Sequence, residues 1–197
     1  RSNFCIILSM DKKSIFYVAF LRGINVGGHS VKMEVLRKLF QEMGHGNVGS
    51  YIQTGNIFFT NHEKNRTILI EKIEAHLHQA LGYSVPVCLR TLDEIEDILA
   101  LDPFKEINVT QNDRLSVTFL QTKLEKALQL PQVTPDGGFE LIGATESELF
   151  VVWHLINGRP GKSYVFEHIL ETSSTTRFWH TLIKILTAAK KHSLEPS

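Results

Sequence analysis

Apolar positions in the first 60 residues follow two different periods. Residues 15–21 are apolar on both faces, which predicts a strand buried on both sides. After Ser30, a favourable N-cap residue, apolar side chains recur at the spacing of a helix. They are Met33, Leu36, Phe40 and Met43. Gly44 is expected to end this helix.

Two strand-like segments, 48–54 and 57–60, flank Gly55-Asn56 and predict a tight hairpin with a type II′ turn. Pairing Thr54 with Ile57 divides the side chains of the hairpin between two faces. One face then carries Tyr51, Gln53 and Phe58, and the other carries Ile52, Ile57 and Phe59.

The pattern continues with a helix over 66–81, which ends at Gly82, and a strand over 85–89. The resulting order, βαββαβ, is that of a ferredoxin-like unit, with four antiparallel strands and two helices on one face. A capping box at Thr91–Glu94 then begins a short helix.

A second unit is expected after a boundary at 101–112. Its predicted elements are a strand at 115–119, a helix after the capping box Thr122–Glu125, a hairpin of 139–143 with 148–154, a helix from Ser163 to Leu170, and a last helix from after Thr176 to about Lys191. No final strand is predicted. The chain is therefore expected to be an α+β protein with two ferredoxin-like subdomains, at 15–100 and 113–192, the second ending in a C-terminal helix.

The last predicted helix supplies one specific expectation about the core. Trp179 should be largely buried, because it shares a helical face with three other apolar side chains. They are Leu182, Ile183 and Leu186.

Composition limits the classes of partner. Lys and Arg number 21, as do Asp and Glu, so nucleic acid or an anionic membrane would have only a local patch to recognise. No apolar run is long enough to span a bilayer. Cys5 and Cys88 are far apart and lack a C-x-x-C spacing, which favours a reducing compartment, the cytoplasm. Met10 is the expected natural start, with residues 1–9 either foreign or an ordinary extension and no signal peptide.

The first candidate site is the glycine-rich stretch Gly23–Ser30, between a predicted strand and a predicted helix. Its spacing is similar to that of a phosphate-binding P-loop, whose backbone N–H groups bind an anion. His29 stands where the P-loop lysine would be, and a split sheet is not a P-loop architecture, which argues against a nucleoside triphosphatase. A glycine-rich connection that needs positive φ angles explains the stretch equally well.

Two further segments are candidates for contact with an anion. In Gln53–Asn56, Asn56 would present its amide at the tip of the hairpin, although turn chemistry alone explains these residues. In Thr175–Arg177, a hydroxyl, free N–H groups and a guanidinium would converge at the start of a helix. The alternative there is an N-cap followed by a surface arginine.

Other reactive side chains favour structural roles. His76 and His78 are two residues apart on a predicted helix, so they point to different faces and do not form a metal pair. Cys88 lies in an apolar strand and is expected in the core. The carboxylates of Glu94, Glu96 and Asp97 resemble a solvated helix face. No catalytic residue, cofactor or metal site is assigned.

Several motifs occur together in one order. They are Arg22–Gly28 (RGINVGG), Lys32-Met33, Tyr51–Asn56, Asp102–Phe104 and Thr176–Thr181. Over residues 15–190 the chain resembles the bacterial domain-of-unknown-function 1697 family, whose biochemical role is not established. The resemblance implies two α+β subdomains of ferredoxin-like character and no particular activity. The family tends to have Asn where this chain has Phe178 and His180, so Arg177, Trp179 and Thr181 are the matching residues there.

Three functions stay open at this point. The first is a protein that binds a small molecule or an anion, with or without enzymatic activity. The second is a nucleic-acid binder, and the third is an interaction module without a small ligand. For the first, we expect the loop 22–28 and the segment 176–177 to form one anion-accepting pocket. The alternative is that Arg22 and Arg177 bridge the halves through carboxylates such as Glu140 or Glu148. Its candidate residues are Arg22, Gly23, Asn25, Gly27, Gly28, Gln53, Gly55, Asn56, Thr176 and Arg177. The second needs an open sheet face beside Tyr51 and Phe58 for base stacking, with local basic residues such as Arg22, Arg90 and Arg177. Packing of that face against the second unit is favoured instead. The sequence does not select a ligand, a reaction or an oligomeric state.

Overall fold

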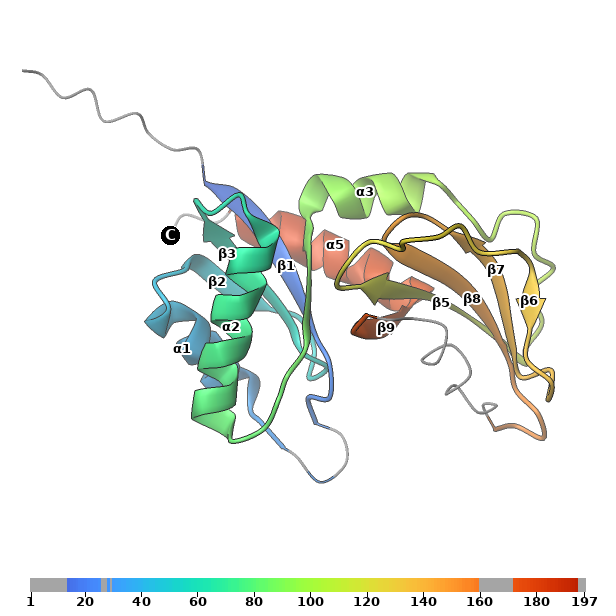
Figure 1. Cartoon of the computed structure of the whole chain (residues 1–197), viewed down its shortest axis with the longest axis horizontal. Helices are drawn as coiled ribbons and strands as arrows, with labels where there is room; N and C mark the ends of the chain where they lie inside the picture. Colours follow the sequence, from blue (N-terminus) through green and yellow to red (C-terminus); the bar gives the residue numbers. More distant parts are fainter. Residues whose placement is uncertain (1–13, 26–27, 29, 160–171, 195–197) are drawn as a thin grey trace, which may run out of the picture.

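The computed structural model describes residues 14–25, 28, 30–159 and 172–194. These residues form two antiparallel sheets with helices packed on and between them (Figure 1). The helix predicted from Ser163 to Leu170 lies outside the described residues. The α+β class predicted from the sequence is confirmed.

The first sheet has the ferredoxin-like strand order β2-β3-β1-β4, with every neighbouring pair antiparallel. Its elements are β1 (Ile15–Leu21), α1 (Met33–Glu42), β2 (Gly46–Ser50), β3 (Asn56–Asn61), α2 (Arg66–Leu81) and β4 (Val87–Thr91). Helices α1 and α2 cover one face, where their apolar side chains pack against Ile57 and Phe59. The order βαββαβ is therefore present as predicted.

Local signals explain why these helices begin and end where they do. The side chain of Asn65 accepts a hydrogen bond from the backbone N–H of Ile68 and caps α2, and Gly82 ends it in the left-handed conformation. The following helix, α3 (Leu92–Ala100), begins with the predicted capping box, in which Thr91 and Glu94 bond each other's backbone N–H.

The hairpin of β2 and β3 forms, but its predicted two-residue turn is wrong. Ser50 pairs with Ile57 and Gly49 with Phe58, so the connection is the longer segment 51–55. The strand β2 is bulged between Gly46 and Gly49, which shifts the register that simple alternation predicts. Asn56 is consequently the first residue of β3 and fully buried, rather than an amide at an exposed tip.

The second sheet repeats the strand order of the first, with one added edge strand. Its strands are β5 (Asp113–Leu120), β6 (Gln132–Val133), β7 (Phe139–Ala144), β8 (Glu148–His154) and β9 (Ser174–Phe178), in the order β6-β7-β8-β5-β9. Two predictions are wrong here. Residues 122–130 form no helix, and the final strand β9 is present, placed before the last helix α5 (Trp179–Ser193).

The face of the first sheet that α1 and α2 do not cover packs against one face of the second sheet, and the two faces form a shared core. Phe20 of β1 stacks on Phe119 of β5 with ring centroids 4.1 Å apart, and Phe58 is 1% exposed. The other buried members of this core are Val18, Cys88, Val117, Phe150, Val152, Ile95, Ile98, Phe104, Leu182, Ile185 and Ala189. The nucleic-acid alternative requires an open sheet face. That face is not available, because the second sheet and helices α3 (Leu92–Ala100) and α5 (Trp179–Ser193) cover it.

Helices α3 and α5 each cross from one sheet toward the other (Figure 1). Helix α5 leaves β9 and ends against the edge of the first sheet, where His192 Nε2 lies 3.2 Å from the carbonyl oxygen of Asn47. Phe104, just beyond α3, packs edge-on against Phe150 of β8. This crossing joins the two halves through one hydrophobic core.

Trp179 supports this core less completely than predicted. Its indole is half-buried and meets the ring of Phe104 at 5.1 Å, whereas Ile183 is 47% exposed. The buried side chains of α5 are instead Leu182, Ile185 and Ala189. The buried face is therefore rotated about the helix axis relative to the predicted face. We expect Trp179→Ala to cost roughly 2–3 kcal/mol, below the range for a fully buried ring. A urea titration checks this, with Ile183→Ala as an exposed control that should cost under about 0.5 kcal/mol.

His45 gives the first half a dependence on pH. Its Nδ1 lies 2.8 Å from Asn61 Nδ2, which must donate, so Nε2 carries the proton of the neutral ring. That Nε2 is buried and has no hydrogen-bond partner among the described residues. Burial, and secondarily the nearby His76, lower the pKa of His45 to about 4.

We expect the free energy of unfolding to decrease as the pH falls from about 6.5 toward 4. In this range His45 binds a proton in the unfolded chain, whereas in the folded chain it stays neutral until the pH approaches its lowered pKa of about 4. The shift of this pKa corresponds to on the order of 3 kcal/mol at its limit. Urea titrations across this pH range should show a flatter profile for His45→Leu than for the unmodified protein. Parallel profiles would mean that His45 does not cause the acid sensitivity.

Candidate functional site

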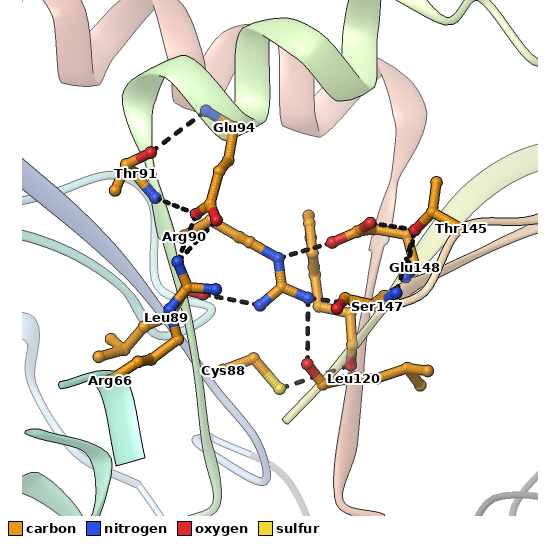
Figure 2. A network of polar contacts seen from close by, with 11 residues as sticks. Arg66, Cys88, Leu89, Arg90, Thr91, Glu94, Leu120, Thr145, Ser147 and Glu148 are labelled. Atoms are coloured by element: carbon orange, nitrogen blue, oxygen red, sulfur yellow. Dashed lines mark hydrogen bonds and ion pairs between the residues drawn. The ribbon is translucent and has the colours of Figure 1, made fainter. Parts of the chain in front are cut away.

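A buried arginine in β4 organises the junction between the two halves. Arg90 is 2% exposed and donates from Nε to Glu148 Oε1 at 2.6 Å. Its Nη2 donates to the carbonyl oxygens of Leu120 at 3.0 Å and Ser147 at 2.8 Å, and its Nη1 to that of Leu89 (Figure 2). Strand β4 of the first sheet is thereby fixed to the β7–β8 turn of the second.

Polar groups from α2 and α3 extend this network toward solvent. Arg66 donates from Nη2 to both carboxylate oxygens of Glu94, at 2.6 and 2.8 Å (Figure 2). Burial alone would raise the pKa of Glu94, but hydrogen bonds from Arg66 and from the N–H of Thr91 outweigh it and hold the pKa below its usual range. Glu94 therefore stays ionised at neutral pH.

A cavity of about 360 Å³ lies over this network and opens to solvent between the halves. Its lining residues are Arg66, Arg90, Glu94, Asp97, Ile98, Leu101, Lys123, Thr145, Glu146, Ser147 and Glu148. Three side chains are cationic and four are carboxylates. Both halves contribute, so the cavity exists only in the assembled chain. Its volume is in the usual range for a small-molecule site.

Arg177 of β9 occupies the corresponding position at the other junction. It is 9% exposed and donates from Nε to Asn56 Oδ1 at 2.6 Å. Its Nη2 donates to the carbonyl oxygens of Leu21 at 3.1 Å and Thr54 at 3.0 Å, with Gly55 at 3.3 Å. Nη1 donates to Thr175 Oγ1 at 2.9 Å and to the carbonyl oxygen of Thr176 at 2.8 Å.

Arg90 and Arg177 occupy equivalent positions in the two halves, as in an internal pseudo-twofold repeat. Each is the fourth residue of the last strand of its own sheet and is followed by a crossing helix. Each donates from Nε to the first residue of a strand in the opposite half, Glu148 of β8 or Asn56 of β3. Each also binds the carbonyl oxygen of Leu120 or Leu21, the last residue of β5 or β1. The halves therefore hold each other by matched, reciprocal contacts.

The residues predicted from the sequence to bind an anion are only partly in the expected geometry. Thr176 and Arg177 lie in a paired strand, not at a helix start, because Thr176 pairs with Thr118 of β5. The five N–H groups of Arg177 face protein oxygens. Its guanidinium is therefore not open to a ligand, contrary to the expectation from the sequence. That part of the prediction is corrected: Arg177 joins the halves.

The glycine-rich loop and the β2–β3 turn do lie together next to Arg177. Asn25 donates from Nδ2 to the carbonyl oxygen of Gln53 at 2.8 Å and accepts from the N–H of Val31. Gly55 is buried with φ +71°, and a Cβ atom there would lie 2.9 Å from Leu21 Cβ, so only glycine permits this close approach. Gly23 and Gly28 also have positive φ, Arg22 is half-buried, and Gly27 lies outside the described residues.

Sequence reasoning missed the cavity. The sequence predicts Glu94 on a solvated helix face and gives no site role to Arg66 or Lys123. The available signal was Arg90, a charged residue inside an otherwise apolar strand immediately before a capping box. A buried arginine of this kind requires acceptors from another segment.

Other chemistry has little support in the described part of the chain. Burial raises the pKa of the Cys88 thiol to about 11, so it is a poor nucleophile at neutral pH. Within residues 14–25, 28, 30–159 and 172–194, no three His, Cys, Asp or Glu side chains are grouped to hold a metal ion. None of the described helices has the length and apolar character needed to cross a membrane.

Comparison with known families identifies the family of this chain. A family model described as "Protein of unknown function (DUF1697)" matches residues 15–150, which include both Arg90 and Glu148. The chain belongs to the DUF1697 family. The matched part ends before β9, so Arg177 and α5 lie beyond it. No match is found among curated proteins.

A solved structure is similar in fold to this DUF1697 chain. The conserved bacterial protein SP0830 from Streptococcus pneumoniae is 23% identical, with a TM-score of 0.64 over 90% of this chain and 99% of the other. At this identity the likeness concerns the fold. It extends over both halves, including the region beyond the family match.

Proposed function

We propose that this DUF1697 protein binds a small polar molecule in the cavity between its two halves. The observation that carries the proposal is the convergence of three cationic and four carboxylate side chains on a 360 Å³ cavity. The site differs from the loop 22–28 that the sequence suggested, while the class of function, small-molecule binding, is retained.

The charges of the cavity favour a ligand that carries both signs. Arg66 is already paired with Glu94, and Lys123 with Glu146. A simple anion would compete with these carboxylates, and a simple cation with the basic side chains. A zwitterion satisfies both members of an opened pair, as a free amino acid or an amino-sugar phosphate would. The side chains of Lys123 and Glu146 are 73% and 72% exposed, so their pair is weak and opens at little cost.

Thermal-shift titrations test this proposal with matched variants. We expect zwitterionic compounds to raise the melting temperature more than monoanions or monocations of similar size. Lys123→Ala and Asp97→Ala remove exposed lining groups and should weaken binding about tenfold, the loss of one charged hydrogen bond. Lys184→Ala, on the exposed side of α5, is the control and should bind as the unmodified chain does. Unchanged binding in both lining variants would contradict the proposal.

The cellular location of the protein is also part of this proposal. Two cysteines without a C-x-x-C spacing favour a reducing compartment, so we place the protein in the cytoplasm. Fractionation of cells that express the natural gene tests this placement, and recovery with a secreted or membrane fraction would contradict it.

A further inference from the structure

Among the described residues, the charge of Arg177 is buried without a carboxylate partner. Its hydrogen-bond acceptors there are the side chains of Asn56 and Thr175 and backbone carbonyl oxygens, all of them neutral. Arg90, its pseudo-twofold equivalent, instead pairs with the carboxylate of Glu148. Burial lowers the pKa of Arg177 to about 10, which still leaves it charged at neutral pH. A buried charge of this kind is costly unless opposite charge lies near it.

The hydrogen bonds next to Arg177 point in one direction, from the buried guanidinium to the surface. Arg177 has donors only, so the atom of Asn56 that faces it must be Oδ1. Asn56 Nδ2 then donates to Thr54 Oγ1 at 2.9 Å. Because the Thr54 hydroxyl accepts this bond, its own proton is available to donate. Thr54 is exposed, so that donation is directed to solvent.

The equivalent chain at Arg90 points the opposite way. Arg90 donates to Glu148 Oε1, and the Thr145 hydroxyl donates its proton inward to Glu148 Oε2. The oxygen of the Thr145 hydroxyl accepts from the backbone N–H groups of Ser147 and Glu148. This hydroxyl therefore has no proton left to donate to solvent, whereas the hydroxyl of Thr54 has one. The replacement of a carboxylate by an amide at the start of the strand thus changes the direction in which the neighbouring hydroxyl donates.

We propose that the turn Gln53–Gly55 binds a small oxyanion of the phosphate class, with the Thr54 hydroxyl as its direct donor. Hydrogen bonds in a chain polarise one another, so the charge of Arg177 strengthens donation by Thr54. The anion also supplies the negative charge that the partners of Arg177 lack. Asn25 holds the turn in place through the carbonyl oxygen of Gln53. This site is separate from the cavity and does not rest on the function proposed for it.

Titration with inorganic phosphate at constant ionic strength tests the site through the melting temperature and calorimetry. Thr54→Val keeps the shape of the side chain and removes the donor, so binding should weaken about tenfold or more. Thr54→Ser restores the hydroxyl and should bind within about threefold of the unmodified chain. Asn56→Asp places a carboxylate beside Arg177 and should abolish binding.

Controls separate this site from the cavity. Lys123→Ala should leave phosphate binding unchanged, and Thr54→Val should leave binding of zwitterions in the cavity unchanged. Equal phosphate affinity in Thr54→Val and the unmodified protein would overturn the proposal, as would the absence of a phosphate effect beyond that of chloride. Because Thr54 is exposed, this test does not depend on whether Asn56→Asp folds.

Discussion

Arg177→Met should destabilise the protein by roughly 3–5 kcal/mol, among the largest effects of any single change in the chain. Methionine fills much of the volume but donates no hydrogen bond. The carbonyl oxygen of Leu21 and Oδ1 of Asn56 would then be buried without their donor. Each buried acceptor left unpaired costs about 1–3 kcal/mol.

Urea unfolding followed by fluorescence measures this loss. Arg177→Lys should recover only part of it, because a single ammonium cannot reproduce the planar set of donors. Arg114→Met is the matched control, because Arg114 is exposed and its hydrogen bonds within the described part of the chain go to the local carbonyl oxygens of Gln111 and Asp113. Its replacement should cost under about 0.5 kcal/mol. A loss below 1 kcal/mol for Arg177→Met would show that the reciprocal contact does not stabilise the halves.

Arg90→Met should also cost roughly 3–5 kcal/mol, for a different reason. It would leave the carboxylate of Glu148, which is 6% exposed, buried with the Thr145 hydroxyl but without its cation. Glu148→Gln should cost less, because the neutral amide still accepts from Arg90, as Asn56 does from Arg177.

A double-mutant cycle isolates this pair. We expect Arg90→Met with Glu148→Gln to cost less than the sum of the two single changes by about 1–3 kcal/mol, since the isolated charge is then removed. Strictly additive costs would mean that the ion pair contributes no coupling and that the loss comes from the bonds of Arg90 to the carbonyl oxygens of Leu120 and Ser147.

Most of the fold could be predicted from the sequence because its signals are local. The cap of α2, its end at Gly82 and the capping box of α3 each depend on a few neighbouring residues. The hairpin turn could not be predicted, because the bulge in β2 changes the register without a strong local signal. The strand β9 was missed since it is short and polar, with the sequence Ser-Thr-Thr-Arg-Phe. The division into subdomains at 15–100 and 113–192 stays a prediction.

The candidate site was harder to predict because its geometry comes from tertiary structure. Arg177 does lie near the glycine-rich loop, yet its donors face protein oxygens that sequence reasoning could not pair with it. The cavity combines residues of α2, α3 and the β7–β8 turn, which are up to about 80 positions apart in the chain. No short motif joins them, although each arginine preceding a crossing helix is visible in the sequence.

A crystal structure of the full chain, soaked with the zwitterion that gives the largest thermal shift, tests the central claim most directly. The account predicts ligand density in the cavity between the halves, with a negative group beside Arg66 or Lys123 and a positive group beside Asp97 or Glu146. Density for the ligand elsewhere on the protein, with this cavity occupied only by solvent at saturating ligand, would contradict the account.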